Sequence, residues 1–139
     1  MRETMNIKIA NLHRYFLTLM FLLFIPSCMF MKPEALNIIP SHDLHQLMEK
    51  EDVFLVDVHI PEQDHIIGTD LFVPFHKIEE NLNKFPKDKE TPIYLYCESG
   101  PMGNYAARTL LKAGYLNIYN LEGGTHAWKD SGYSFKKIE

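Results

Sequence analysis

A strand, a loop and a helix follow one another directly in residues 93–114, which read Ile93-Tyr-Leu-Tyr-Cys97-Glu-Ser-Gly100-Pro-Met-Gly-Asn-Tyr-Ala-Ala-Arg-Thr-Leu110-Leu-Lys-Ala-Gly114. The apolar run Ile93–Tyr96 is typical of a strand that is buried on both faces of a parallel sheet. From residue 102 to residue 113 the apolar side chains form a wide helical face, and Gly114 suits the position after a helix end. We therefore expect a strand followed by a helix, joined by a short loop that begins with Cys97.

Outside this segment the chain alternates the same two signals. They predict further strands at 36–39, 53–56, 71–73 and 117–121, and further helices at 41–48, 76–85 and 125–129. Ser41 suits the N-cap of the first of these helices, and the piece Pro61–Ile66 is expected to form a short turn or helix. This alternation indicates a single α/β domain with a mainly parallel central sheet and helices on both faces. Ligands bind such sheets beyond the carboxyl ends of the strands, where Cys97 lies.

The composition excludes several classes of protein. The chain has 139 residues, of which 46% are hydrophobic and 23% charged, so it suits one folded domain and is too apolar to be intrinsically disordered. Its net charge of −4 argues against a nucleic-acid partner, which would normally meet a basic patch. Its two cysteines, Cys28 and Cys97, do not make a disulfide framework.

The first thirty residues predict an export signal rather than a part of the domain. Basic residues at positions 2, 8 and 14 precede the apolar run Tyr15–Ile25, which ends at Pro26-Ser27-Cys28. A basic start, a short apolar core and a small residue before the break are typical of a secretory signal peptide. The run is short for a membrane span, which needs about 20 residues. We therefore predict a signal peptide at 1–27, a short tether at 28–35 and the folded domain at 36–139.

Cys28 is the candidate site of lipid attachment. The tripeptide Ile25-Pro26-Ser27 before it resembles a bacterial lipobox, and this resemblance implies cleavage before Cys28 and lipidation of its thiol. The protein would then be an exported lipoprotein, anchored to a membrane and facing the periplasm or the cell surface. An uncleaved N-terminal anchor, ordinary secretion and a buried core helix remain the alternatives. Cys97 would then be a free cysteine in an oxidising compartment, which marks it as a candidate reactive group.

The loop that follows Cys97 is the candidate binding loop. It consists of Glu98, Ser99, Gly100, Pro101, Met102 and Gly103. Its backbone N–H groups can point at one spot, and the N-terminus of the following helix adds its positive end. A cysteine sulfur held there is favoured as the thiolate, and the same cradle suits a persulfide or a sulfur oxyanion. The alternative is an ordinary buried cysteine that packs at the end of a strand.

Five motifs follow one another in order along the chain. They are Val56-Asp57-Val58-His59, His65-Ile66-Ile67-Gly68-Thr69, Cys97-Glu98-Ser99-Gly100, Ala106-Ala107-Arg108-Thr109-Leu110, and Gly114-Tyr-Leu-Asn-Ile-Tyr-Asn-Leu-Glu-Gly-Gly-Thr-His-Ala-Trp128. On these motifs the chain from about Leu36 to Tyr133 resembles a single-domain rhodanese. The resemblance implies a rhodanese-like fold and a sulfurtransferase.

The implied chemistry is covalent catalysis by Cys97. Its sulfur would attack the outer sulfur of thiosulfate or of a persulfide donor, become a persulfide, and pass that sulfur to a thiophilic acceptor such as a small thiol or a protein thiol. The loop amides from Glu98 to Gly103 would stabilise the anionic persulfide. His59 and Asp57 are auxiliary candidates: His59 would assist proton transfer at Cys97 or meet Glu98, or else it makes a structural hydrogen bond to Asp57.

The chain departs from the family pattern around this site. Met102 stands where many members have an arginine, and Pro101 removes one N–H from the loop. Glu98 places a negative charge beside a site that should receive anions, and His59 replaces the usual arginine after Asp-Val. These departures favour a low-charge persulfide or a protein partner over thiosulfate. They also keep a second hypothesis, a non-catalytic rhodanese-like module that binds a partner or carries persulfide or redox signals.

Two other chemistries are disfavoured. Phosphatases that resemble this family have a loop one residue longer that ends in arginine, whereas Met102 and Gly103 occupy the corresponding places here. His42 and His45 lie three residues apart on a predicted helix, but a zinc site needs three or four ligands, so we expect a solvated helix face. Neither a metal nor a cofactor is expected.

Overall fold

The computed structural model describes residues 35–138, and its strands β1 (Ala35–Ile39), β2 (Phe54–Asp57), β4 (Leu71–Phe72), β5 (Ile93–Tyr96) and β6 (Asn117–Leu121) form one sheet. The strands lie in the order β1-β6-β5-β2-β4, and all neighbours are parallel. The predicted parallel sheet is confirmed, with each strand within one residue of its expected bounds. The strand that precedes Cys97 lies at the centre of this sheet.

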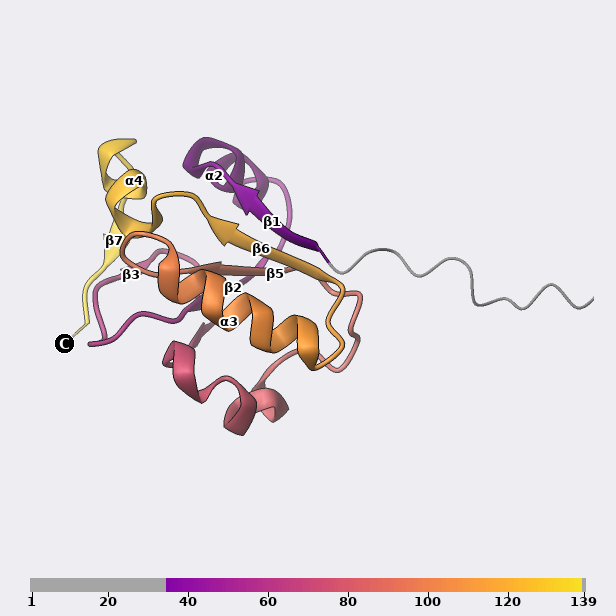
Figure 1. The fold of residues 1–139 in the computed structure, drawn as a ribbon. Coiled ribbons are helices and arrows are strands. Elements are labelled where there is room, and N and C mark those ends of the chain that lie inside the picture. The colour runs from indigo at the N-terminus through magenta and orange to yellow at the C-terminus, as the bar shows by residue number, and fades with distance from the viewer. Residues whose placement is uncertain (1–34, 139) are drawn as a thin grey trace, which may run out of the picture. The chain divides into compact units, whose positions relative to one another are not determined.

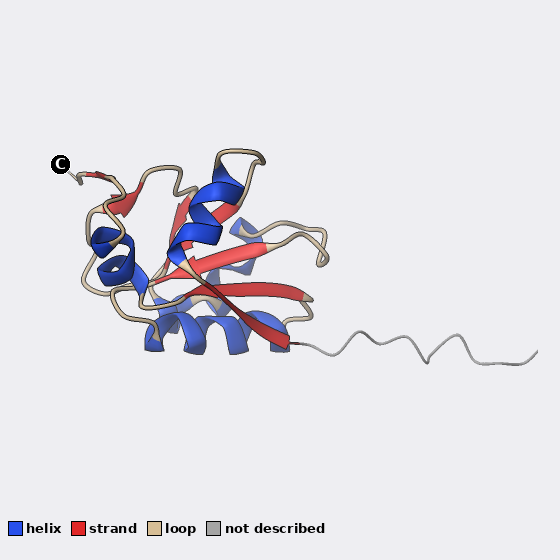
Figure 2. Ribbon diagram, turned by 90° about the horizontal axis from the view of Figure 1, so that it is seen from above, coloured by secondary structure: helices blue, strands red, loops and turns tan. Residues whose placement is uncertain are grey.

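Two crossover connections run in opposite directions across the sheet. Helix α2 (Ser41–Met48) leads from β1 to β2, whereas helix α3 (Pro101–Lys112) leads from β5 back to β6. Because right-handed crossovers in opposite directions place their helices on opposite faces, α2 and α3 cover different sides of the sheet. Figure 1 shows α3 on one side and α2 with α4 (Gly124–Asp130) on the other, and Figure 2 gives the view from above. Helices on both faces are therefore confirmed.

The sheet separates two apolar clusters. Cluster 1, on the α3 side, consists of Val56, Val58, Val73, Ile78, Phe85, Ile93, Leu95, Cys97, Ala106, Ala107, Leu110, Tyr115 and Ile118. Cluster 2, on the side of α2 and α4, consists of Leu44, Leu55, Ile66, Tyr94, Tyr96, Leu121 and Trp128. Side chains alternate along β5, so its four residues are shared between the two clusters and all four are buried. This burial on both faces explains the unbroken apolar run in the sequence.

Helix α3 begins and ends at residues that suit those positions. Pro101 is its first residue, where the missing N–H has no partner to lose. Gly114 follows the helix with φ +90°; its N–H donates to the carbonyl of Leu111, and the N–H of Tyr115 donates to the carbonyl of Leu110. These two bonds make a Schellman motif, so the expected role of Gly114 is confirmed.

The single helix predicted at 76–85 is wrong. The structure has two 3₁₀ helices there, η2 (Phe75–Lys77) and η3 (Glu79–Lys84). The side chain of Asn81 explains the difference, because its Nδ2 donates to the carbonyl of Lys77 at 2.9 Å. In an α-helix that carbonyl would accept the backbone N–H of Asn81, which instead donates to the carbonyl three residues before it.

Two smaller expectations also differ from the structure. Pro40 occupies the N-cap position of α2, and Ser41 is a helical residue whose Oγ is buried without a hydrogen-bond partner. In place of a turn or helix at 61–66, the chain forms the short strand β3 (His65–Ile66), which pairs antiparallel with β7 (Phe135–Lys136). The C-terminal strand therefore fastens the loop that follows β2.

The predictions for the N-terminal segment, including the signal peptide, the cleavage site and the lipidation of Cys28, lie outside the described residues. Among the helices of residues 35–138, none combines the length and the apolar character that a membrane span requires. All the described residues belong to one compact unit.

Candidate functional site

Cys97 follows the last residue of β5, at the carboxyl edge of the sheet. It is 1% exposed, is not in a disulfide, and packs within cluster 1 together with Val58 and Ala107. The N–H of Val58 donates to the carbonyl of Tyr96 at 2.9 Å, so the pairing of β2 with β5 continues up to this point. The cysteine thus stands at the expected edge, in closely packed surroundings.

One backbone amide of the expected cradle reaches the sulfur. The N–H of Gly100 donates to Cys97 Sγ at 3.0 Å, and this is the one hydrogen bond to that sulfur within residues 35–138. Gly100 has φ +118°, a backbone conformation that strongly favours glycine. Of the predicted cradle of amides from Glu98 to Gly103, only the Gly100 N–H makes a hydrogen bond to the sulfur among the described residues.

The first turn of α4 holds the other side of the loop. The N–H groups of Thr125 and His126 donate to the carbonyls of Cys97 and Glu98, at 2.9 and 3.1 Å. Gly124 lies so close to the loop that a Cβ at this position would be 2.2 Å from the carbonyl oxygen of Cys97. Only glycine allows this approach. The φ of Gly124, +56°, is also a left-handed conformation that favours glycine.

Asn120, near the end of β6, reaches the start of α3. It is 2% exposed, and its Nδ2 donates to the carbonyl of Gly100 at 3.0 Å and to Oδ1 of Asn104 at 2.8 Å. Gly103 faces this amide so closely that a Cβ there would lie 2.0 Å from Oδ1 of Asn120. Gly103, predicted as a binding-loop residue, therefore gives the Asn120 side chain its space.

The remaining loop residues differ in exposure. Glu98 and Ser99 are exposed, as is Pro101, whereas Met102 is half-buried and packs against cluster 1. Oε1 of Glu98 lies 3.4 Å from Nε2 of His126. When His126 is protonated, it offsets part of the negative charge that Glu98 brings to the loop.

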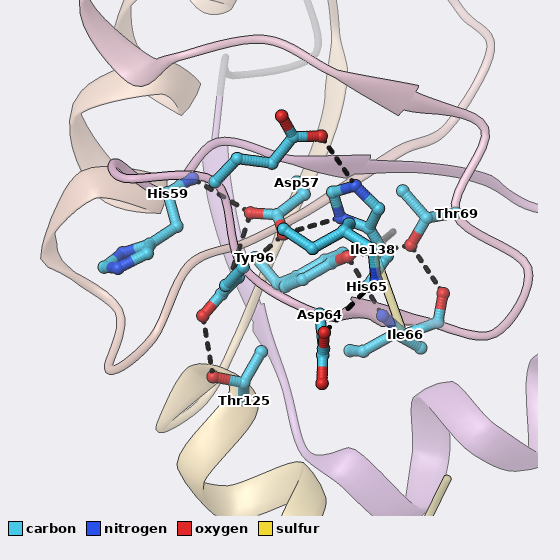
Figure 3. A network of polar contacts seen from close by, with 11 residues as sticks. Asp57, His59, Asp64, His65, Ile66, Thr69, Tyr96, Thr125 and Ile138 are labelled. Carbon is cyan, nitrogen blue, oxygen red and sulfur yellow. Dashed lines mark hydrogen bonds and ion pairs between the residues drawn. The ribbon is translucent and has the colours of Figure 1, made fainter. Parts of the chain in front are cut away.

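Asp57, the last residue of β2, is fully buried and is the centre of a polar network (Figure 3). It accepts hydrogen bonds from the backbone N–H of His59 at 2.9 Å and from Nε2 of Gln63 at 3.3 Å, and it pairs with Nδ1 of His65 at 3.0 Å. Oε1 of Gln63 accepts a hydrogen bond from Thr125 Oγ1 at 3.4 Å. The network thus links Asp57 to the turn of α4 that holds the Cys97 carbonyl.

His59 contacts Asp57 through its main chain and not through its ring. Figure 3 shows the ring pointing away from Asp57, and its Nδ1 is buried without a hydrogen-bond partner. The imidazole that meets Asp57 belongs to His65, whose Nε2 also lies 3.1 Å from Oε1 of Glu62. The structural alternative for His59, a hydrogen bond to Asp57, is therefore present in the structure, while the side-chain contact is made by His65.

Tyr96 completes this region on the cluster 2 side. Its hydroxyl accepts the N–H of Ile66 at 3.1 Å and lies 2.8 Å from Thr69 Oγ1. Burial, followed by the negative charge of Asp57, raises the pKa of Tyr96 far above its ordinary value of 10.0. The phenol therefore stays protonated and serves as a fixed hydrogen-bonding group.

The expectation for His42 and His45 is correct in part. His42 is exposed, whereas the ring of His45 stacks on that of Tyr133 with centroids 4.0 Å apart and is half-buried. Within residues 35–138, no group of three or more His, Cys, Asp or Glu side chains is placed to hold a metal ion.

Sequence reasoning did not identify the residues that support the Cys97 loop and the Asp57 network from elsewhere in the fold. These are Gln63, His65, Asn120, Gly124 and Thr125. Three of them lie within the motif 114–128, so the run Asn120-Leu-Glu-Gly-Gly-Thr125 was a usable signal. It served only to identify a resemblance, since contacts between β6, α4 and the Cys97 loop need the folded chain.

Three proteins illustrate what this chain is similar to. It is 39% identical over 77 residues to a Bacillus subtilis (strain 168) protein named "Uncharacterized protein YqhL"; the alignment covers 53% of this chain and 59% of that relative. A rhodanese-like domain protein from Staphylococcus aureus has a similar structure, with a TM-score of 0.61 and 30% identity, over 73% of this chain and all of that one. A Rhodopseudomonas palustris protein described as "Possible Tyrosine Phosphatase" shares the fold, with a TM-score of 0.62 and 23% identity, over 73% of this chain and 85% of that one.

The family follows from a match that covers most of the described residues. Residues 41–131 match the model of the rhodanese-like domain, a stretch that runs from the start of α2 to the end of α4. It includes four of the five strands of the sheet, β2, β4, β5 and β6, together with Cys97 and its loop. The chain therefore belongs to the rhodanese-like domain family.

Proposed function

We propose that this protein is a sulfurtransferase that carries sulfane sulfur as a persulfide on Cys97. The observation that supports this most directly is the contact between the Gly100 N–H and Cys97 Sγ, 3.0 Å long, at the carboxyl edge of the sheet. An N–H in this position favours an anionic sulfur over a neutral one, because hydrogen bonds to ionised groups are stronger. Membership of the family supports the same chemistry.

The proposed reaction has two exchange steps. In the first, the Cys97 thiolate attacks the outer sulfur of the donor; a new S–S bond forms, the donor S–S bond breaks, and its electron pair leaves with a thiolate or with sulfite. In the second, an acceptor thiolate attacks the outer sulfur of the Cys97 persulfide, and the electron pair returns to Sγ. Each step exchanges one S–S bond for another, so no further oxidant or reductant is consumed.

The charges at the loop support a donor of low charge. No Lys or Arg is present in residues 97–103, and the exposed carboxylate of Glu98 lies beside the site. Thiosulfate is a dianion and would approach this carboxylate, whereas the persulfide of a small thiol or of a protein carries less charge. The same lack of an arginine gives a phosphate dianion no bidentate partner, so phosphatase activity is not proposed.

A substitution at Cys97 tests the proposal. After incubation with thiosulfate or a thiol persulfide, we expect the intact protein to gain the mass of one sulfur atom and Cys97→Ser to gain none. Transfer to cyanide should fall at least ~10³-fold in the variant, because a serine hydroxyl does not replace the thiolate. Arg108→Ala, an exposed change on α3, is the control and should retain activity. If the wild-type protein gains no sulfur from any sulfane donor, the proposal fails.

The second candidate is a non-catalytic module that binds a partner or relays persulfide or redox signals. The 1% exposure of Cys97 favours it, because a buried sulfur is reached by a donor only if the loop moves. A low rate of alkylation of Cys97 by iodoacetamide, together with no sulfur uptake, would support a module that binds a partner over the enzyme.

We further propose, on the sequence of residues 1–28, that the protein is exported and lipidated at Cys28. The basic start, the apolar run and the lipobox-like tripeptide support this. Metabolic labelling with palmitate should mark the wild-type protein and not Cys28→Ala. An unlabelled wild-type protein would contradict the proposal.

A further inference from the structure

Hydrogen bonds to both the N–H and the carbonyl of Gly100 hold the turn from the Cys97 loop into α3. Its N–H donates to Cys97 Sγ at 3.0 Å, while its carbonyl accepts the Asn120 side chain at 3.0 Å and the backbone N–H of Asn104 at 3.1 Å. A Cβ at Gly100 would meet no atom within 4 Å, so steric packing on that side does not fix its orientation. Hydrogen bonds are therefore what orient Gly100, because a glycine backbone has few steric restrictions of its own.

Asn120 reaches Gly100 from a different element. It lies on β6, twenty residues along the chain, and its side chain enters the space left by the missing Cβ of Gly103. The N–H of Asn104 belongs to α3 itself, so it moves together with the start of the helix and does not fix the turn relative to the sheet. The Asn120 amide is anchored in the sheet, so it ties the turn to the same rigid layer from which Cys97 emerges.

Stability alone does not explain an asparagine at this position. The residue is 2% exposed, and its Oδ1 is buried without a hydrogen-bond partner. Leaving a buried acceptor unpaired costs free energy that an apolar side chain of similar size would avoid. What the asparagine supplies is the Nδ2 donor, which the structure directs at Gly100 and Asn104.

We propose that Asn120 is a positioning residue that holds the Gly100 N–H toward the sulfur of Cys97, an inference that rests on the proposed sulfurtransferase function. Because it is 2% exposed, it is not placed to contact a sulfur donor or a sulfur acceptor itself. Its role is to fix the one amide that reaches the sulfur before charge is placed there, so that the amide does not have to reorient when the persulfide forms. Without this hold, Gly100 samples other conformations, and the persulfide loses its hydrogen bond.

The test compares Asn120→Leu with the matched variant Asn104→Ala. Asn120→Leu removes the donor to Gly100 and to Oδ1 of Asn104, and it leaves no polar atom at position 120 itself. Asn104→Ala removes the other partner of the Asn120 amide but keeps the contact with Gly100. The first readout is hydrogen–deuterium exchange of the Gly100 amide, measured by NMR; the second is single-turnover sulfur loading from thiosulfate and from glutathione persulfide. A urea midpoint for each variant separates these readouts from stability.

We expect Asn120→Leu to raise the Gly100 exchange rate at least tenfold and to lower the loading rate at saturating donor at least fivefold, with the half-saturating donor concentration unchanged. Asn104→Ala should stay within twofold of the wild type in both readouts. If Asn120→Leu lowers the urea midpoint but leaves the Gly100 exchange rate and the loading rate of the folded protein unchanged, Asn120 has a structural role only and the proposal is overturned. Faster exchange with an unchanged loading rate would overturn it as well.

The two proposals fail separately. If the wild-type protein takes up no sulfur, the proposed function is lost, and unchanged Gly100 exchange in Asn120→Leu independently overturns the positioning role. If Asn120→Leu does not fold, Asn120→Ala takes its place, with the same expected changes in exchange and loading.

Discussion

Gly100, within the Cys97 loop, and Gly124, which packs against that loop, are each required as glycine for a different physical reason. Gly100 adopts φ +118° so that its N–H faces the sulfur, whereas Gly124 must come close to the carbonyl of Cys97. Both are positions where a side chain would alter the loop itself. The geometry around the sulfur therefore depends on residues that carry no functional group.

The close approach at Gly124 predicts a large effect for Gly124→Ala. The new Cβ would lie 2.2 Å from the carbonyl oxygen of Cys97, in addition to the strain of a residue with φ +56°. Gly132→Ala is the matched control, because Gly132 has φ +81° but open space around the new Cβ. We expect the control to lose about 1–2 kcal/mol of unfolding free energy and Gly124→Ala to lose more, measured by urea titration. Equal losses would show that the contact with Cys97 is not tight.

Glu98 sets the charge that a donor meets at the loop. Neutralising it in Glu98→Gln should lower the KM for thiosulfate about 2- to 5-fold, since exposed charges interact by less than about 1 kcal/mol. The KM for a persulfide of low charge should change little. His126→Ala, which removes the partner 3.4 Å from Glu98, should raise the thiosulfate KM instead. An unchanged thiosulfate KM in both variants would contradict a role of this charge in donor choice.

At the scale of elements, β5 and α3 were readable from sequence because their patterns are local. The buried run Ile93–Tyr96 and the spacing of Ala106, Ala107 and Leu110 each describe one element against a core. The break between η2 and η3 was not readable, because it depends on which donor takes a single carbonyl, that of Lys77. Helical spacing is the same for both outcomes.

The candidate site likewise has a part that local sequence patterns predict and a part that they do not. Cys97 and its loop follow from the order of strand, cysteine and helix, so their position was predictable. The contacts made by Asn120, Gly124 and Thr125 join elements that are 20 or more residues apart in the chain, and no local pattern records them. Residues that hold a loop from a neighbouring strand or helix become visible only in the folded structure.

Where β5 ends, Tyr96 makes the stability of the fold depend on pH. Its pKa is raised above the ordinary 10.0, first by burial and then by the charge of Asp57. Above about pH 10 the unfolded chain gives up a tyrosine proton that the folded chain keeps, so the stability present below this pH is lost as the pH rises. The pKa of Tyr94 is raised as well, again chiefly by burial.

We therefore expect the urea midpoint of the wild-type protein to fall steeply above about pH 10 and that of Tyr96→Phe to fall less steeply. At neutral pH the variant should be less stable by about 1–2 kcal/mol, because Ile66 and Thr69 lose a hydrogen-bond partner. Tyr94→Phe should also flatten the alkaline slope. Identical slopes for Tyr96→Phe and the wild type would contradict the assignment.

At the scale of the whole molecule, the sheet divides the core into clusters 1 and 2. The candidate site lies at the end of β5, where neighbouring residues belong to different clusters. Cys97 faces cluster 1, whereas Tyr96, the residue before it, faces cluster 2. Because consecutive residues of a strand point to opposite faces, each cluster is packed by its own set of helices. The sulfur is therefore supported by α3 on one side, and the network around Asp57 by α4 on the other.

This division predicts that mutations in different clusters act independently. Ile93→Val in cluster 1 and Ile66→Val in cluster 2 should each cost about 0.5–1.5 kcal/mol of unfolding free energy, and the double variant should cost their sum within about 0.5 kcal/mol. The rings of Phe54 and Phe85 pack edge to face on the cluster 1 side, with centroids 6.1 Å apart. Phe54→Leu and Phe85→Leu should therefore couple by about 0.5–1.5 kcal/mol. Urea titrations of the two double-mutant cycles measure both quantities. Coupling across the sheet as large as that between the two phenylalanines would mean that the clusters form one core, and that a change on the α2 side reaches the packing around Cys97.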